Sequence, residues 1–431
     1  MGLISSLDNI WKDSNDPFFI YKEKNIFFSE IKNLYSVNLE TIKKGDVVAI
    51  IGDFNPHSIL TLLLLIDKGA IVVPLTIETK SEHEYFFETA LVDFVIYNKN
   101  ITPRKHNDKN PLISSIRNKG HSGLILFSTG TTGRPKAILH DLTLFLRRYE
   151  TKRPTLRTIN FLLFDHIGGI NTLFHTLFNK GIVIAPEERS VQSILYVCKK
   201  YQVEVLPTTP TFLRLMLMSG VINDGISDSL KIITYGTERM DQPTLDELCR
   251  ILPNIDFRQT YGMSELGIVR VKSEHRQSLY MKLGGEGVET RVVNNILEIR
   301  SPTRMLGYLN FPSPFDDDGW YNTKDIVDVK NSFYKITGRS NEIINVAGIK
   351  FMPSEVERVA LKYKKISMVK ACGKKNPITG EHVELFVQPK NNTVIEKKEL
   401  MSYLKNNLTS YMVPKRIIIE NINVGHRFKK T

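Results

Sequence analysis

Apolar residues along this 431-residue chain occur mostly in short runs, which polar or glycine-containing turns separate. The segment from Ile50 to Leu75 gives the repeating unit: an apolar run, a loop, a long apolar stretch that stops at Gly69, and the run Val72-Val73. Glycine commonly follows the last turn of a helix, and strands buried in parallel sheets are continuously apolar. The pattern therefore predicts strand, loop, helix and buried parallel strand.

Similar units recur up to about residue 285. A strand pair and a helix are expected within residues 1–45, and the polar residues 98–120 are expected to form a loop. Further strands are expected within 94–97, 124–127, 181–187, 230–238 and 257–267, with one ending at 165–166, and helices from 168–169 onward and over 191–201. The repeated strand–turn–helix order predicts an α/β fold whose functional residues lie on loops after the strands.

Short strands replace this pattern after residue 285, and a smaller helix–strand–helix pattern follows Arg339. We therefore predict a large N-terminal domain of mostly parallel αβα sheets with a small β-barrel-like part, followed by a small α+β C-terminal domain. The boundary is placed between Ser340 and Asn341, which gives domains 1–340 and 341–431. The second domain has roughly the length of an independent folding unit.

Composition limits the location and the partners. Lysine and arginine number 58 against 46 acidic residues, so the formal net charge is +12, and the cations are scattered along the chain. This surplus suits phosphate-bearing ligands or acidic partners as well as nucleic acid, and without a basic, aromatic-rich stripe we do not predict nucleic-acid binding. The three cysteines lie far apart, which predicts reduced thiols in a cytoplasmic protein. The N-terminal residues lack a basic segment before an apolar core, so no secretory signal is expected. The most apolar run, 59–66, is shorter than the roughly 20 residues of a membrane-spanning helix.

The stretch 124–140, LILFSTGTTGRPKAILH, carries the strongest chemical signal. Hydroxyl groups in it can donate to anionic oxygens, its glycines let the backbone approach a ligand, and a lysine adds charge. In a P-loop the lysine directly follows the second glycine, whereas Arg134 and Pro135 intervene here. We favour a phosphate cradle of another design over a plain polar turn. The residues expected to hold a polyanion are Ser128, Thr129, Gly130, Thr131, Thr132, Gly133 and Lys136.

Four further motifs follow along the chain. TYGMSE at 260–265 offers a hydroxyl, an aromatic ring, a glycine and a carboxylate, and YGTE at 235–238 follows an expected strand. GWYNTKD at 319–325 ends in Asp325, whose carboxylate can accept hydrogen bonds from two hydroxyls. The segment 338–350, GRSNEIINVAGIK, joins the two expected domains.

In this order, the motifs resemble the signatures of the adenylate-forming superfamily, which includes acyl- and aryl-CoA synthetases, peptide-synthetase adenylation domains and luciferases. The resemblance covers the chain from about residue 45 to the end, and the N-terminal region is shorter than in most relatives. It implies a mobile C-terminal lid domain and ATP-dependent activation of a small carboxylic acid. The implied cofactors are ATP, Mg²⁺ and CoA, or the phosphopantetheine of a carrier protein, and a homodimer is left open.

The resemblance also implies roles in nucleotide binding. Tyr261 would stack on the adenine, Thr260 would contact the α-phosphate, Asp325 would bind the ribose hydroxyls and Arg339 would reach the ribose or phosphate. Glu265 would hold Mg²⁺, which takes hard oxygen ligands. Besides the 128–136 loop, the residues expected to bind the nucleotide are Gly236, Thr237, Glu238, Thr260, Tyr261, Gly262, Asp325 and Arg339.

The segment between the domains departs from the family at one position. Relatives usually place Asp or Lys two residues after the arginine as a hinge, and this chain has Asn341 there. Asparagine tolerates unusual backbone angles, so we keep Asn341 as the expected hinge. Gly348 and Lys350 lie in the loop that, in relatives, enters the site for the thiol step.

The catalytic lysine of the family follows a glycine near the C-terminus, and two registers are open. Aligning Gly425 with that glycine puts His426 at the lysine position, whereas counting from the strand RIIIENI puts Phe428 at the glycine and Lys429 at the lysine. We adopt Lys429, since it keeps the ammonium, against the alternative of a solvated basic tail. Lys429 would neutralise charge on the reacting carboxylate and α-phosphate, and with Thr131, Glu265 and His166 it forms the expected catalytic set.

His166 falls where relatives have an aromatic residue or histidine at the mouth of the acyl pocket. The glycine pair 168–169 would leave room there for a flat ring or a medium-length chain. Asp165 precedes the position at which amino-acid-activating relatives bind the α-ammonium group, so no role is assigned to it.

Three functions compete. The first is an acyl- or aryl-acid ligase that makes a thioester, and the second is an amino-acid-adenylating enzyme that loads a carrier protein. The third is a non-enzymatic basic protein, which would show salt-sensitive nucleic-acid binding. We favour the first.

Overall fold

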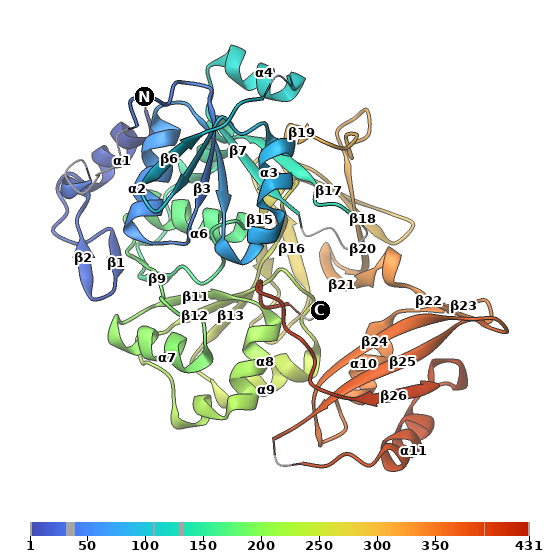
Figure 1. Ribbon diagram of the computed structural model, residues 1–431. Helices are drawn as coiled ribbons and strands as arrows, with labels where there is room; N and C mark the ends of the chain where they lie inside the picture. The colour runs from blue at the N-terminus through green and yellow to red at the C-terminus, as the bar shows by residue number, and fades with distance from the viewer. Residues whose placement is uncertain (1, 32–38, 107, 129–132, 392, 430–431) are drawn as a thin grey trace.

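The computed structural model describes residues 2–31, 39–106, 108–128, 133–391 and 393–429. The chain forms a large part with three sheets and a small part with one sheet (Figure 1). This is the large α/β domain and small α+β domain that the sequence predicts. Sheet membership changes between Arg339, at the end of a strand of the large part, and Ile344, at the start of a strand of the small part. Among the described residues, no helix is long and apolar enough to cross a membrane.

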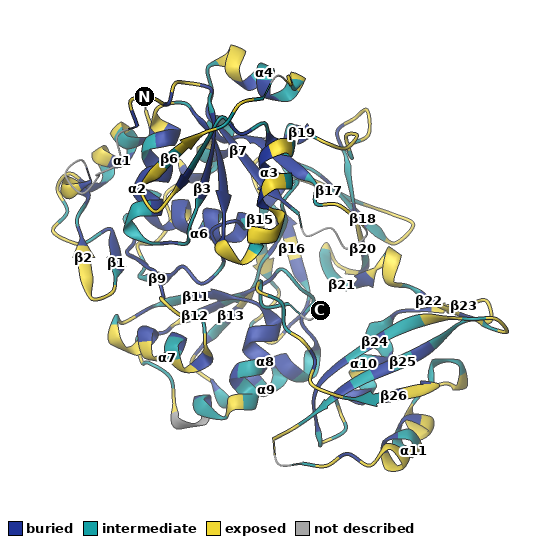
Figure 2. Cartoon of the chain, in the orientation of Figure 1, coloured by how far each residue is buried: buried dark blue, intermediate teal, exposed yellow. Residues whose placement is uncertain are grey.

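The first sheet of the large part has seven strands with parallel pairing among the inner four. In order they are β19 (Gly307–Tyr308), β8 (Ala137–Asp141), β7 (Gly123–Phe127), β4 (Ile71–Leu75), β3 (Val47–Ile51), β5 (Phe94–Tyr97) and β6 (Asn100–Pro103). Strands β4 and β7 are buried along their whole length (Figure 2), as their unbroken apolar runs require. The helices that belong to this region are α2 (Pro56–Asp67), α3 (His83–Ala90), α4 (Pro111–Lys119) and α5 (Leu142–Leu146).

The second sheet is parallel except for one terminal hairpin. Its order is β13 (Asp256–Gln259), β12 (Ile232–Tyr235), β11 (Val205–Thr208), β9 (Thr158–Ile159), β10 (Val183–Ile184), β1 (Phe19–Tyr21) and β2 (Lys24–Ile26). Its helices are α1 (Leu3–Trp11), α6 (Ile167–Phe178), α7 (Val191–Lys200), α8 (Pro210–Ser219) and α9 (Gln242–Ile251). One apolar core joins this sheet to the first, because α1, α2 and α6 pack together between them. The indole N–H of Trp11 donates to the Leu177 carbonyl at 3.0 Å and ties α1 to α6.

The third sheet is the small β part, and its pairings run in one open, antiparallel path. Its order is β14 (Tyr261–Met263), β15 (Gly267–Ser273), β16 (Met281–Gly284), β21 (Phe333–Arg339), β20 (Tyr321–Lys330), β18 (Ile296–Arg300) and β17 (Glu289–Val293). Because β14 follows β13 almost directly, the edge of the second sheet leads straight into this one.

The small part packs two helices against a five-stranded sheet. The strands are β22 (Ile344–Val346), β23 (Ile349–Phe351), β24 (Ile366–Asn376), β25 (Gly380–Pro389) and β26 (Arg416–Ile419), and the helices are α10 (Pro353–Ala360) and α11 (Lys397–Asn407). After β26 the chain returns to the centre of the large part, where the C-terminus lies (Figure 1).

Two expectations about elements were wrong. Residues 98–120 are not a plain loop, because they contain β6 and α4. The Asn110 side chain caps α4, Pro111 occupies its first turn, and Ile113 and Ile116 are buried, so a short amphipathic helix forms within a polar stretch. The strand expected to end at 165–166 is only β9, Thr158–Ile159, and a loop leads from it to α6.

Candidate active site

Three side chains from two motifs and the interdomain segment meet at the third sheet. The Tyr261 hydroxyl donates to Asp325 Oδ2 at 2.6 Å, and Arg339 Nε donates to Asp325 Oδ1 at 3.0 Å. Tyr261 and Asp325 are buried, whereas about half of the Arg339 side chain is exposed. Burial, and then the Asp325 carboxylate, raise the pKa of Tyr261 well above its ordinary value, so the phenol stays a donor. The sequence predicted these residues for one nucleotide site, and the fold brings them together.

Sheet register explains this cluster. Asp325 on β20 faces Arg339 on β21 as a direct cross-strand pair. The Thr323 hydroxyl accepts from the Asp325 backbone N–H at 3.1 Å and donates to the Leu297 carbonyl at 2.7 Å, which fixes the strand at this point. The threonine of the G-W-x-x-T-x-D motif thus holds the backbone that carries the aspartate.

The YGTE and TYGMSE loops touch through a glycine. A Cβ on Gly236 would lie 2.1 Å from Thr260 Oγ1, so only glycine permits this approach. The Thr260 backbone N–H donates to the Tyr235 carbonyl at 2.7 Å. A Cβ on Gly262 would lie 2.6 Å from the Gly267 carbonyl oxygen. Both predicted loops therefore pass close to one another at the ends of β12 and β13.

Glu265 is held by a residue that no motif named. The Tyr308 hydroxyl donates to Glu265 Oε1 at 2.7 Å, and burial, followed by the Glu265 charge, raises the pKa of Tyr308. A carboxylate oxygen is a hard donor of the kind Mg²⁺ accepts, commonly as one carboxylate together with substrate phosphates. In the described part of the chain no three His, Cys, Asp or Glu side chains cluster as a metal site. The donor chemistry of Glu265 alone fits a hard cation such as Mg²⁺.

The predicted phosphate loop connects β7 and β8, which pair as an antiparallel hairpin. The Ser128 N–H donates to the Lys136 carbonyl at 3.0 Å, and the Lys136 N–H donates to Ser128 Oγ at 3.2 Å, which closes the base of the loop. Lys136 Nζ lies 4.7 Å from the centre of the Tyr308 ring. Thr129, Gly130, Thr131 and Thr132 lie outside the described residues, so their roles stay predictions, as does that of Gly133 beside them.

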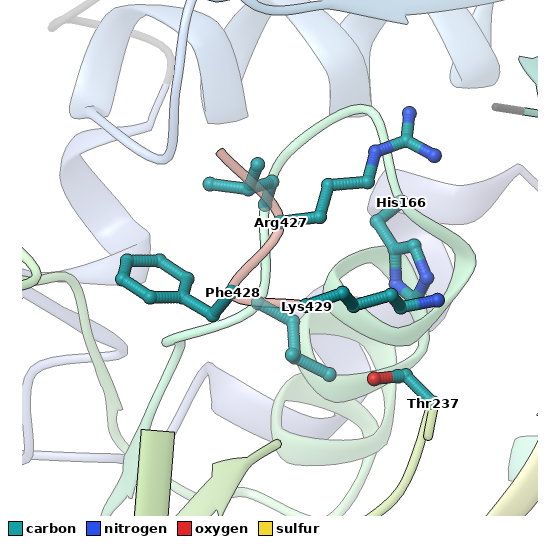
Figure 3. Close-up of a pocket in the computed structure, with 7 residues that line it drawn as sticks. His166, Thr237, Arg427, Phe428 and Lys429 are labelled. Carbon is teal, nitrogen blue, oxygen red and sulfur yellow. The ribbon is translucent and has the colours of Figure 1, made fainter. Parts of the chain in front are cut away.

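The C-terminal tail reaches a small cavity in the large part (Figure 3). The residues that line the cavity are Leu162, Leu163, His166, Thr237, Arg427, Phe428 and Lys429. Burial is the main cause that lowers the pKa of Lys429 from 10.5 to about 8, while the Glu238 carboxylate opposes the shift. His426 is not among the lining residues. Phe428 has a φ of +53°, as expected of a residue at the position of the family's glycine. The register adopted from the sequence thus puts its lysine among the residues that line the cavity, and the catalytic role of Lys429 stays a prediction.

His166 begins α6 in this cavity. Its Nδ1 accepts from the Gly168 N–H at 3.0 Å, so the ring caps the helix and carries its proton on Nε2. Burial, together with the Arg427 and Lys429 cations, holds the pKa of His166 well below its ordinary value. The imidazole is therefore neutral at pH 7 and acts as a polar, uncharged wall of the cavity.

The glycine pair after His166 does not open space for an acyl group. A Cβ on Gly169 would lie 2.1 Å from the Leu163 carbonyl oxygen, and one on Gly168 would lie 2.6 Å from the Leu162 side chain. The missing side chains let the 162–163 loop pack onto α6. The expectation that these glycines make room for a ring or a chain is therefore wrong.

Thr237 lines the cavity, and the next residue, Glu238, lies within electrostatic reach of Lys429. The Thr211 hydroxyl donates to Glu238 Oε2 at 2.9 Å, so the carboxylate is bound to the first turn of α8. Thr237 has a φ of +70°, and its buried Oγ1 has no hydrogen-bond partner among the described residues. The YGTE loop thus supplies one negative charge and one unused hydroxyl near Lys429.

Two contacts of the tail were not predicted from any sequence motif. Arg427 Nη2 donates to Asp165 Oδ2 at 2.8 Å, and the Thr209 hydroxyl donates to the Phe428 carbonyl at 2.8 Å. Asp165 could have been noticed in the sequence as a charged residue within the apolar run before α6. Since Arg427 already pairs with this carboxylate, Asp165 is not an open ammonium site in this conformation.

The expected hinge and thiol-side residues lie apart from this cavity. Asn341 lies in a single 3₁₀ turn between β21 and β22, at the change of sheet. Gly348, with a φ of +87°, forms with Ala347 the turn between β22 and β23, and Lys350 is exposed on β23. This hairpin projects from the small part away from the C-terminus (Figure 1).

Comparison with known families gives two matches in chain order. The AMP-binding enzyme family matches residues 102–309, and the AMP-binding enzyme C-terminal domain matches residues 355–422. The first match includes the phosphate-loop, YGTE and TYGMSE motifs, and the second lies within the small part.

Curated proteins with similar sequences include CoA ligases. The chain is 24% identical to 4-coumarate–CoA ligase-like 6 of Arabidopsis thaliana over 332 residues. This alignment covers 69% of the present chain and 58% of that protein. The chain is 25% identical to acyl-CoA synthetase ALT10 of Alternaria alternata over 349 residues. This alignment covers 68% of the present chain and 61% of that synthetase. The match thus spans about three fifths of these relatives.

Solved structures match over nearly the whole chain. The o-succinylbenzoate CoA synthetase of Bacillus subtilis, in complex with its acyl-adenylate intermediate, superposes with a TM-score of 0.78 at 16% identity, over 100% of this chain and 96% of that one. ATP-bound MatB of Rhodopseudomonas palustris superposes with a TM-score of 0.79 at 19% identity, over 99% of this chain and 97% of that one. The fold is therefore shared in both parts. From the two family matches and this fold, the chain belongs to the AMP-binding enzymes of the adenylate-forming superfamily.

Proposed function

We propose that the protein is an AMP-forming acid–thiol ligase. It would join a carboxylic acid to ATP, release pyrophosphate, and pass the acyl group from the acyl-adenylate to a thiol. The observation that carries this proposal is the insertion of Lys429, from the tail of the small part, into a cavity of the large part beside His166 and Thr237. An ammonium at that place meets the YGTE loop and lies within electrostatic reach of Arg339.

In the first step, a carboxylate oxygen attacks the α-phosphorus of ATP. The bond from that phosphorus to the oxygen bridging to the β-phosphate breaks, and pyrophosphate leaves with the electron pair. Such a transfer needs positioning and charge stabilisation rather than a protein nucleophile. Lys429 would stabilise the charge that the carboxylate and α-phosphate share. One preorganised donor of this kind lowers a barrier by about 2.7–4 kcal/mol.

The nucleotide would lie along the three predicted motifs. Asp325, fixed by Tyr261 and Arg339, is suited to accept hydrogen bonds from the ribose hydroxyls. The Gly236–Glu238 loop would line the adenine, and Thr260 would meet the α-phosphate. The loop 128–136, with Thr131 and Lys136, would hold the leaving pyrophosphate.

Glu265 would hold Mg²⁺ together with the phosphates of ATP. When bound, the cation supplies charge neutralisation at those phosphates. Tyr308 keeps the carboxylate in one orientation through its 2.7 Å hydrogen bond, which is how an outer partner commonly fixes a metal ligand.

The second step would use another arrangement of the small domain, 341–431, against the large domain, 1–340. Rotation about Asn341 would withdraw Lys429 and bring the Gly348 turn and Lys350 toward the adenylate. The thiol sulfur would attack the acyl carbon, the bond to the AMP oxygen would break, and the thiol proton would pass to solvent. CoA or the phosphopantetheine of a carrier protein would supply the thiol, and the free cysteines favour a cytoplasmic setting.

The test is a pyrophosphate-exchange screen with a panel of acids, followed by mass spectrometry with and without CoA. The panel should contain 4-coumarate, anthranilate, o-succinylbenzoate and long-chain fatty acids, which names of relatives and similar structures suggest, and the common amino acids. Exchange with an aryl or acyl acid, and a CoA thioester of the same acid, is the expected result. Exchange with amino acids alone, or no exchange with any acid, would overturn the proposal.

A further inference from the structure

The last residues of the tail form a tight turn from which three side chains diverge. The Phe428 N–H donates to the Gly425 carbonyl at 2.8 Å, and the Gly425 N–H donates to the Lys429 carbonyl at 2.9 Å. Phe428 and Lys429 point in opposite directions from this turn, and Arg427 extends beside His166 (Figure 3). One rigid turn therefore sets the positions of the three side chains together.

Arg427 is anchored by a buried ion pair. Its guanidinium donates to Asp165 Oδ2 at 2.8 Å, and the side chains of Arg427 and Asp165 are only 13% and 5% exposed. The same nitrogen lies 3.5 Å from the carbonyl oxygen of Phe127, the last residue of β7 before the phosphate loop. The tail thus contacts both the loop before α6 and the base of the phosphate loop.

Phe428 is anchored by aromatic packing. Its ring centre lies 4.9 Å from that of Phe161 and 5.6 Å from that of Phe212, in the core of the second sheet. The Thr209 hydroxyl holds its carbonyl. A side chain at a position with a φ of +53° is strained, so its packing must offset that cost.

We propose that Asp165 is a positioning residue that acts through Arg427. The Asp165–Arg427 pair and the packing of Phe428 against Phe161 and Phe212 form a latch, which holds the tail so that Lys429 lies in the site during adenylate formation. The latch opens for the thiol step, and Lys429 is then withdrawn. This inference rests on the proposed function. The physical reason is that the buried ammonium opposes insertion until the phosphates of ATP arrive, so other contacts must favour the inserted state. Because one partner lies on the tail and the other on the large domain, the pair exists only while the tail is inserted.

The test compares Asp165→Asn, Arg427→Gln and the double variant in two separate assays. Pyrophosphate exchange reports adenylate formation, and transfer from a synthetic acyl-adenylate to CoA reports the thiol step alone. Removing one partner of a buried pair leaves the other charge unpaired, so each single variant should lower exchange by about tenfold or more. Transfer to CoA should stay within about twofold of wild type, and the double variant should be no slower in exchange than the slower single variant. Arg427→Lys keeps the charge but not the planar fork of the guanidinium, so its exchange rate should lie between those of wild type and Arg427→Gln.

A control removes a more exposed ion pair of the large domain that does not touch the tail. Arg117 pairs with Asp93 at 3.1 Å near the far end of the first sheet, and Arg117→Gln should leave both half-reactions unchanged. The latch would be overturned if Asp165→Asn lowered both half-reactions equally. It would also be overturned if the loss in the double variant equalled the product of the losses in the two single variants.

A second readout does not depend on which acid the protein activates. Amide hydrogen exchange of residues 425–429 in the nucleotide-free protein should be faster in Asp165→Asn than in wild type, while the small-domain strand β25 should exchange at the same rate in both. Equal exchange of the tail in the two proteins would overturn the latch, whatever the outcome of the acid screen. An inactive wild type whose tail loses protection in Asp165→Asn would instead contradict the proposed function alone.

Discussion

Raising the assay pH from 7 to 9.5 tests the role of Lys429 through its protonation. Burial lowers the pKa of this ammonium to about 8 in the nucleotide-free protein. Only the protonated form can neutralise the reacting carboxylate and phosphate, so adenylate formation should be favoured below this pKa and lost above it. With a pKa of about 8 the protonated fraction falls from about 0.9 at pH 7 to about 0.1 at pH 9, a roughly tenfold loss.

The assay is pyrophosphate exchange at saturating Mg²⁺ with the best acid of the screen, measured as kcat/KM for ATP. This quantity follows the ionisation of the free enzyme, whereas kcat follows that of the complex. The bound triphosphate favours the ammonium, so the fall in kcat should occur at a higher pH than the fall in kcat/KM. Because exchange involves no thiol, the ionisation of CoA does not enter.

Lys429→Arg is the control, since a guanidinium stays protonated throughout this range. The variant should be slower than wild type and should show no fall in kcat/KM between pH 7 and 9. His166 adds no ionisation there, because its pKa lies well below the ordinary value. A wild-type profile that is flat to pH 9.5, or a fall that persists in Lys429→Arg, would refute the assignment.

Three other variants test separate parts of the account. Asp325→Asn removes the negative charge and replaces one of the two accepting oxygens with an NH2 donor; it should weaken ATP binding by about 1.5–3 kcal/mol, measured by calorimetry, and unchanged affinity would argue against a ribose site. Tyr308→Phe releases Glu265 and should raise the Mg²⁺ concentration for half-maximal exchange severalfold, at a loss of about 1 kcal/mol, and an unchanged Mg²⁺ dependence would contradict this role. Gly169→Ala sets a methyl 2.1 Å from a carbonyl oxygen and should destabilise the fold by about 1–3 kcal/mol in denaturant unfolding. Gly284→Ala, where the methyl meets no atom within 4 Å, is its control and should change stability by less than about 0.5 kcal/mol.

Part of the candidate site was predictable because it depends on short motifs at strand ends. Tyr261 and Asp325 were expected to lie in one cleft, and their side chains are in contact, since each motif fixes its own loop and the sheet brings the loops together. The hydrogen bond between them was not predicted. Runs of buried residues such as β4 and β7 predicted the parallel core in the same way.

The missed features depend on contacts between distant segments. Arg427 and Asp165 lie 262 positions apart, and their pairing follows from how the small domain meets the large one, which no local pattern encodes. The glycine pair at 168–169 was misread because a sequence shows that a side chain is missing but not which atoms fill the space. In 98–120, a capping asparagine and a proline outweighed the polar composition and formed α4.

The most direct measurement of the central claim follows the oxygen atoms of the acid. An acid labelled with ¹⁸O in its carboxylate is incubated with the protein, ATP, Mg²⁺ and CoA, and the nucleotide products are examined by mass spectrometry. Attack on the α-phosphorus predicts AMP that carries one ¹⁸O atom, with unlabelled pyrophosphate and one thioester formed per AMP. Unlabelled AMP, or ¹⁸O in inorganic phosphate with ADP as the nucleotide product, would contradict the account.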